Sequence, residues 1–280
     1  MNRVTDPFTR RMLVEVLEQR PEGLVLRGGS HREFYNVYGI AHGGYLYTLG
    51  HLAGELTAQL TRETPMDVLD VSCQYLNPFR QFPARVETRW LGGEGSTYLQ
   101  VRVLDSRGLL CFQQYMTLGP AWEQTPHEIP TPSISTDRPL PHSCYEVPQF
   151  PCITSTFSRF LDIYSTRFQD RGLVYAVDPS PANTDGLGRV HPGAMFTAAD
   201  AAAGGTLYYV DKKRPITVSG NIHYHRPAVI GPVSAIPRLV RGGKSLFYYD
   251  LDILDGHDSL VATAQFIIQN TRDYSPEDFQ

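Results

Sequence analysis

Residues 39–60 read GIAHGGYLYTLGHLAGELTAQL, and residues 188–210 read GRVHPGAMFTAADAAAGGTLYYV. Each stretch opens on a turn that contains His and Gly and then continues for several turns without a further proline, in residues that are mostly Ala, Leu, Gly and Tyr. Because the two stretches carry almost no charge, they predict two long, buried helices, each introduced by a loop. The repetition indicates that the chain contains two copies of one unit.

A strand-rich tract of similar length follows each predicted helix. Alternating apolar and polar residues predict strands at 70–79, 84–93, 96–108 and 109–119 in the first copy, and at 217–228, 233–243, 245–258 and 260–270 in the second. Gly-Gly pairs and the turn sequences DSRG and DGHD separate these runs, as is typical of antiparallel hairpins. A strand or two is also expected before each helix, for example at 23–29 and 172–179. Each half is therefore predicted to be an α+β unit, in which an antiparallel sheet curls around one helix.

A proline-rich stretch separates the two copies. Residues 120–151 contain eight prolines and no apolar periodicity. Each proline removes a backbone donor and fixes φ, so this stretch is predicted to be an extended linker. The predicted domains are residues 1–120 and 156–280, with the linker at 121–155.

Composition narrows the class of protein. The 280 residues are 41% hydrophobic and 19% charged, which is typical of a globular protein. A net charge of −4 argues against a nucleic-acid partner, and no apolar run is long enough for a membrane span. The four cysteines form no close pair, so we expect reduced thiols in a cytoplasmic protein; they are Cys73, Cys111, Cys144 and Cys152.

The two copies resemble a known family. A central helix introduced by His-Gly-Gly and followed by long strands resembles the hotdog fold. Two such modules in tandem, paired within one chain, resemble the double-hotdog acyl-CoA thioesterases of the thioesterase II type. The resemblance implies a hydrolase of lipid metabolism that needs no cofactor. Its substrate would be an acyl-CoA or an acylated carrier protein.

Short motifs inside each copy resemble hotdog thioesterases of the phenylacetate-pathway type. That pattern is an Asn, then His-Gly-Gly, then an Asp about two turns into the helix. The first copy has Asn36, His42, Gly43, Gly44 and, where the acid would stand, His51. The second copy has Asp185, His191, Pro192, Gly193 and Asp200 at the same intervals. Each copy thus departs from the pattern, and the two depart in opposite ways.

The chemistry of thioester hydrolysis assigns different parts to the two copies. Negative charge develops on the carbonyl oxygen, and the resemblance implies that the amide directly after the His stabilises it. Gly43 can donate this N–H, whereas Pro192 has none. Asp200 can activate water as a base. We therefore predict one working site per chain, built from Gly43 of the first copy and Asp200 of the second, and one decayed site that holds His51 and Pro192.

The thioesterase II resemblance adds further candidates. It implies that Thr217 helps to hold the attacking water and that Gln265 lies nearby, although Gln265 is displaced by one residue from the family position. Since one residue reverses the side-chain direction on a strand, Gln265 would need a bulge to reach the site. The remaining candidates are predicted to contact the substrate: Asn36, His42, Gly44 and His191. His223 and His225 share one face of a strand, but no Cys or acid is spaced to complete a metal site, so no metal is expected.

Other interpretations remain open. Asp200 with His191 could serve a dehydratase that acts on 3-hydroxyacyl thioesters, and a partly decayed site could bind acyl thioesters without turnover. Asp200 could also be a buried structural acid, and His42 and His191 could only brace their loops. The tyrosines beside the motifs are more typical of core or interface than of substrate contacts; they are Tyr45, Tyr47, Tyr208 and Tyr209. The acyl chain, the choice of carrier and association into a homo-oligomer are left undetermined.

Overall fold

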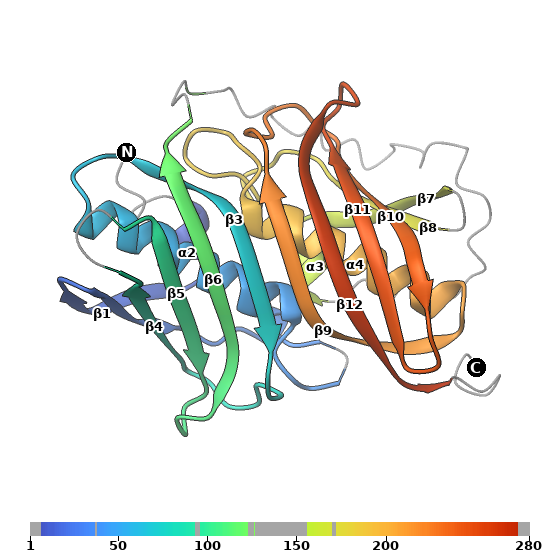
Figure 1. Ribbon diagram of the computed structural model, residues 1–280, viewed down its shortest axis with the longest axis horizontal. Coiled ribbons are helices and arrows are strands. Elements are labelled where there is room, and N and C mark those ends of the chain that lie inside the picture. Colours follow the sequence, from blue (N-terminus) through green and yellow to red (C-terminus); the bar gives the residue numbers. More distant parts are fainter. Residues whose placement is uncertain are drawn as a thin grey trace.

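One continuous, curved antiparallel sheet lies in front of two long helices in the computed structural model (Figure 1). The structure describes residues 7–36, 38–92, 96–122, 126, 156–169 and 172–273, without the side chains of residues 167, 168 and 273. The sheet has 12 strands in the order β1-β2-β4-β5-β6-β3-β9-β12-β11-β10-β8-β7. The strands of the first half occupy one side of the sheet and those of the second half occupy the other.

The elements of the second half repeat those of the first in the same order, apart from one short 3-10 helix. The first half contains α1 (Pro7–Arg11), β1 (Val14–Arg20), β2 (Gly23–Gly28), η2 (Arg32–Phe34), α2 (Gly43–Thr61), β3 (Met66–Tyr75), β4 (Ala84–Trp90), β5 (Tyr98–Leu104) and β6 (Leu110–Pro120). The second contains α3 (Thr156–Phe160), β7 (Ile163–Gln169), β8 (Gly172–Val177), α4 (Pro192–Tyr209), β9 (Lys213–Tyr224), β10 (Val233–Gly242), β11 (Leu246–Leu254) and β12 (Leu260–Asp273). The predicted helices and strands are confirmed.

The halves join where β3 pairs with β9. Counterparts around the two helices lie 149 positions apart (191 − 42), and the same offset relates β3 to β9. Asp70 pairs with His223, and Gln74 pairs with Ser219, so each pair maps onto the other under this offset. The two halves are therefore related here by a local two-fold rotation.

The helices α2 and α4 cross closely at their first turns. A Cβ atom on Gly44 would lie 2.4 Å from Thr197 Oγ1, and one on Gly193 would lie 2.5 Å from Thr48 Oγ1. Only glycine therefore permits this approach. Each threonine hydroxyl donates to the carbonyl oxygen of the glycine four residues earlier in its own helix, at 2.7 Å, so both buried hydroxyls are paired.

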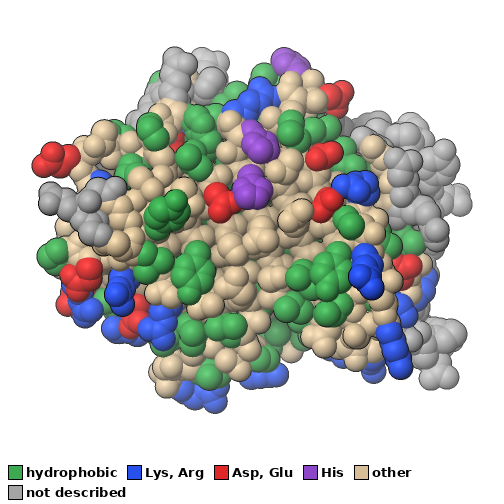
Figure 2. Space-filling view, in the orientation of Figure 1, with side chains coloured by type: hydrophobic (Ala, Val, Ile, Leu, Met, Phe, Trp, Pro, Cys, Tyr) green, Lys and Arg blue, Asp and Glu red, His purple; other side chains and the backbone are tan. Residues whose placement is uncertain are grey.

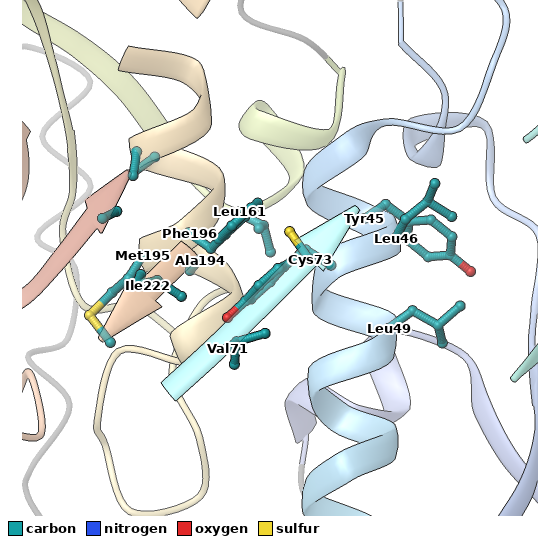
Figure 3. Close-up of a cluster of buried hydrophobic side chains, with 14 of the residues drawn as sticks. Tyr45, Leu46, Leu49, Val71, Cys73, Leu161, Ala194, Met195, Phe196 and Ile222 are labelled. Carbon is teal, nitrogen blue, oxygen red and sulfur yellow. The ribbon is translucent and has the colours of Figure 1, made fainter. Parts of the chain in front are cut away.

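Side chains of both halves share one hydrophobic core between the helices and the sheet. Tyr47 of α2 and Phe196 of α4 stack across the crossing, with ring centroids 3.6 Å apart and planes inclined by 3°. Figure 3 shows part of this core, to which α2, α4, β3 and β9 all contribute side chains. Because the helices are buried on most sides, they need the apolar composition that predicted them.

The opposite face of the sheet is exposed (Figure 2). Histidine side chains gather near its middle, where His223 Nδ1 lies 2.5 Å from Asp70 Oδ2 of the neighbouring strand. No group of three or more His, Cys, Asp or Glu side chains among the described residues could hold a metal ion.

Three further expectations concern the rest of the chain. Cys73 and Cys111 are buried free thiols, as predicted. The linker predicted at 121–155, which includes Cys144 and Cys152, lies outside the described residues apart from 121, 122 and 126. Within the described ranges, no helix has both the length and the apolarity that a membrane crossing requires.

The crossing predicts a large stability cost for Gly44→Val. The new side chain would overlap Thr197, and overpacking of this kind costs about 1–3 kcal/mol. Gly204→Ala is the matched control, because a Cβ atom there meets only Pro215, at 3.8 Å, and alanine favours a helix. Urea unfolding should show a lower midpoint for the first variant and an unchanged or higher midpoint for the second. Equal midpoints would contradict the assigned role of Gly44.

Candidate functional site

A cavity of about 400 Å³ lies between the two halves. The first half lines it with the loop before α2, the first turns of α2 and the end of β3, and the second half lines it with α4 and the start of β9. Gly43, Asp200 and Thr217 all face this cavity. The structure therefore brings together the two parts of the composite site that the sequence predicts.

Asp200 and Thr217 form a direct hydrogen bond. The Thr217 hydroxyl donates to Asp200 Oδ1 at 2.5 Å. The direction of the Thr217 side chain depends on a β-bulge in β9. Ile267 pairs with Ser219 and Ile268 pairs with Thr217, so Val218 is the extra residue of β9. Without that extra residue, the alternation of side chains along β9 would point Thr217 away from α4.

The environment of Asp200 raises the pKa of its carboxyl group. Asp200 lies on α4 among alanines, and burial raises its pKa to about 6, although the hydrogen bond from Thr217 acts in the opposite direction. Burial dominates because a carboxylate loses more solvation there than one hydroxyl returns. A carboxyl group with this pKa is largely ionised at neutral pH and is a stronger base than an exposed aspartate.

The N-terminus of α2 supplies the second part of the site. Gly43 is the first residue of the helix, so its N–H has no acceptor within the helix and points outward from the positive end of the helix dipole. The ring of His42 accepts the N–H of Gly44 at Nδ1, at 3.0 Å, which fixes the loop. Burial lowers the pKa of His42 to about 4, and the neutral ring can therefore act as this acceptor.

Tyr75 completes this wall of the cavity. Its hydroxyl donates to the carbonyl oxygen of Gly43 at 3.0 Å, and its ring packs against the Gly43 Cα. The corresponding tyrosine of the second half, Tyr224, donates in the same way to Pro192 at 3.2 Å. The two helix starts are thus held identically, but only Gly43 retains an N–H.

The predicted substrate-binding residues divide into two groups. Asn36 and His42 line the cavity, and Asn36 Oδ1 also accepts the N–H of Tyr38 at 2.9 Å, which shapes the loop. Gly44 and His191 do not line it. Gly44 lies at the helix crossing. His191 faces a second cavity, which residues of both halves line.

Gln265 does not reach the site. It is exposed on the outer face of β12, and its side-chain amide donates to Asp250 Oδ1 at 3.1 Å. The bulge that it needed occurs on β9 and redirects Thr217 instead. Gln269, four residues further along β12, lines the cavity at its exposed edge. Gln265 and Gln269 lie on the same face of β12, so the sequence pattern alone does not distinguish them. The strand pairing places Gln269 beside Ile216, at the start of β9, which lines the cavity.

Two of the tyrosines expected in the core belong to it and also line the cavity. Tyr208 and Tyr209 are each 9% exposed and form part of the cavity wall together with Tyr175, which is 2% exposed. Tyr45 and Tyr47 are fully buried, as expected. Because Tyr75 and Tyr175 come from strands outside the helix motifs, the local motif pattern gave no signal for them.

A second cavity of about 220 Å³ occupies the pseudo-symmetric position. Here the 149-residue offset puts His51 in place of Asp200, Pro192 in place of Gly43 and Val68 in place of Thr217. His51 therefore provides no carboxylate, Pro192 provides no N–H and Val68 provides no hydroxyl.

Ionisable side chains pair at this second cavity. His191 Nε2 lies 3.3 Å from Glu55 Oε2, and Arg189 Nε lies 2.7 Å from Asp185 Oδ2. Arg189 also lies 3.4 Å from Asp67 Oδ2. His191 is thus engaged by Glu55 and faces a different cavity from Asp200. The dehydratase interpretation, which paired His191 with Asp200, loses its geometric basis.

Comparison with protein families identifies the second half. A family model described as the thioesterase superfamily matches residues 187–262, which include Asp200 and Thr217. The chain is 33% identical over 78 residues to "Putative esterase SSO1253" of Saccharolobus solfataricus and covers 52% of that protein. It is 32% identical over 91 residues to "Putative esterase TV1331" of Thermoplasma volcanium and covers 68% of that protein. These matches use 28% and 32% of this chain, and the chain spans only about half the length of the first of these relatives.

Solved structures match nearly the whole chain. A structure from Thermobifida fusca described as a "putative thioesterase II" has a TM-score of 0.64 at 18% identity, and covers 95% of this chain and 97% of its own. A protein from Alicyclobacillus acidocaldarius described as having a hot dog fold has a TM-score of 0.65 at 13% identity, and covers 93% and 97%. At such low identities the likeness shows the fold alone, which is the hotdog fold.

The raised pKa of Asp200 predicts a pH-dependent effect of Asp200→Asn on stability. The pKa of about 6 in the folded state exceeds that of an aspartate in the unfolded chain. The free energy of unfolding therefore falls as the pH rises between these two pKa values and the carboxylate forms. The variant should therefore melt near the wild-type temperature at pH 4 and a few degrees above it at pH 7.5. Scanning calorimetry across this range measures the difference. If the difference in melting temperature between variant and wild type did not change with pH, burial would not raise the pKa of Asp200.

Proposed function

The chain belongs to the thioesterase superfamily, and we propose that it hydrolyses the thioester of an acyl-CoA or of an acylated carrier protein in the cavity between its halves. The observation that carries the proposal is the meeting of Asp200, Thr217 and Gly43 at one cavity. A base, a hydroxyl that orients water and a free helix-terminal amide are the groups that hydrolysis of a thioester requires.

In the proposed reaction, Asp200 accepts a proton from a water molecule that Thr217 helps to orient. The water oxygen attacks the carbonyl carbon, and the electron pair of the C=O bond moves to the oxygen, where the N–H of Gly43 stabilises the negative charge. The C–S bond then breaks as the carbonyl re-forms, and the proton held by Asp200 passes to the sulfur. The products are a carboxylic acid and a thiol, and Asp200 returns to its ionised state.

The same proposal treats residues 1–120 and 156–280 as two hotdog modules that pair within the chain. The repeated order of elements and the shared β3–β9 junction support this division. One catalytic site per chain follows, because the positions that correspond to Gly43 and Asp200 in the other half hold Pro192 and His51, which provide neither the amide nor the carboxylate.

Asp200→Asn should abolish hydrolysis while the protein stays folded, because the amide side chain cannot accept the proton. For the wild type, kcat should rise with pH to a plateau above about 6, as the carboxylate forms. Thr217→Val removes the hydrogen bond that lowers the pKa of Asp200, so the rise of kcat with pH should move to higher pH. A thiol-release assay over acyl-CoAs at several pH values measures all three. Full activity of Asp200→Asn would overturn the proposal, and a binder without turnover would show no thiol release in the wild type.

Gly43→Pro should test the amide selectively. Proline is accepted at the first position of a helix, as Pro192 shows at the start of α4, but it has no N–H to donate. Loss of one oxyanion donor costs on the order of 10²–10³ in kcat. Gly43→Ala is the matched control, since it adds a Cβ beside Tyr75 and keeps the N–H. Similar kcat values for the two variants would remove Gly43 from the mechanism.

A further inference from the structure

Gly204 opens the cavity one helical turn beyond Asp200. Residues four apart lie on the same face of a helix, so Asp200, Gly204 and Tyr208 form a line along α4, and all three face the cavity. A Cβ atom on Gly204 would have no neighbour within 4 Å other than Pro215, at 3.8 Å. The space beside Gly204 therefore belongs to the cavity and is not filled by another part of the protein.

The pseudo-symmetric residue shows what a side chain does at this position. The counterpart of Gly204 in α2 is Glu55 (204 − 149), and it projects into the second cavity, where its carboxylate lies 3.3 Å from His191. The second cavity measures about 220 Å³, against about 400 Å³ for the first. The absence of a side chain at Gly204 thus separates an open cavity from a bridged one.

Aromatic side chains close the far end of the space beside Gly204. Tyr208 follows on the same helix face, Tyr209 lies next to it, and Tyr175 packs within 3.0 Å of a Cβ position on Gly205. All three rings are at most 9% exposed. The other side of the cavity reaches solvent past Leu76 and Gln269, which are exposed. The carrier would enter from that side, and the acyl group would point toward the rings.

We propose that Gly204 forms the floor of an acyl pocket that ends at Tyr208, and that the substrate carries a compact apolar acyl group. The inference rests on the proposed function, because it takes the thioester carbonyl to lie beside Asp200. The helix rises about 12 Å from Asp200 to Tyr208 at 1.5 Å per residue. An extended chain advances roughly 1.2 Å per bond, and contact with the Tyr208 ring takes up about 3.5 Å of this length, so a chain of about eight carbons fills the rest.

Graded substitutions at Gly204 should shorten the pocket. Wild-type kcat/KM should be highest for hexanoyl- to octanoyl-CoA and should fall at least tenfold for hexadecanoyl-CoA. Gly204→Val should lower kcat/KM for octanoyl-CoA at least tenfold more than for acetyl-CoA, and Gly204→Ala should lie between it and the wild type. Glu55→Gln changes the corresponding residue of the second cavity and should leave the chain-length profile unchanged.

Binding of alkyl-CoA thioethers, which no hydrolase cleaves, separates the pocket from the chemistry. Octyl-CoA should bind the wild type more tightly than hexadecyl-CoA, and Gly204→Val should weaken octyl-CoA more than ethyl-CoA. This result without any thioester hydrolysis would overturn the proposed function and leave the pocket in place. Hydrolysis with equal losses for all chain lengths in Gly204→Val, or a wild type that prefers hexadecanoyl-CoA, would overturn the pocket and leave the proposed function in place.

Discussion

The close crossing of α2 and α4 is the constraint on which the rest of the structure depends. Two glycines let the helices approach until each meets a threonine of the other, and the stacked rings of Tyr47 and Phe196 fill the space beside them. This contact places the start of one helix against the middle of the other. The N–H of Gly43 and the carboxylate of Asp200 face one cavity only because the helices cross at this depth.

The crossing is symmetric, but the chemistry on its two sides is not. The tyrosines that hold the helix starts are the same on both sides, as are the histidines that cap them. One side has an amide donor, a carboxylate and open space, whereas the other has proline, histidine and a glutamate that spans the cavity. Burial explains why the difference is stable. A buried carboxylate such as Glu55 requires partners, and the second cavity supplies them, whereas Asp200 pairs with Thr217 alone among the described residues and keeps a raised pKa.

Strand geometry decides which polar side chains reach the site. The structure places Thr217 beside Asp200 and Gln265 on the outer face of its strand. The bulge at Val218 accounts for both outcomes, since an extra residue in β9 reverses the direction of Thr217 and leaves β12 unchanged. Gly44 and His191 failed as cavity residues for a different reason. Gly44 lies at the crossing, against Thr197, whereas His191 belongs to the second copy of the motif, which faces the other cavity.

Local patterns in the sequence predicted the duplication, the two buried helices, the antiparallel strands and the asymmetry between Gly43 and Pro192. They were sufficient because periodicity, proline content and residue type act over a few neighbouring positions. The family resemblance predicted that Gly43 and Asp200 share a site, but the tertiary structure alone decided that Tyr75 and Tyr175 help to enclose its cavity and that Glu55 bridges the counterpart of that cavity. These relations join residues more than a hundred positions apart or on different strands. They depend on the helix crossing and on strand register, which no local spacing specifies.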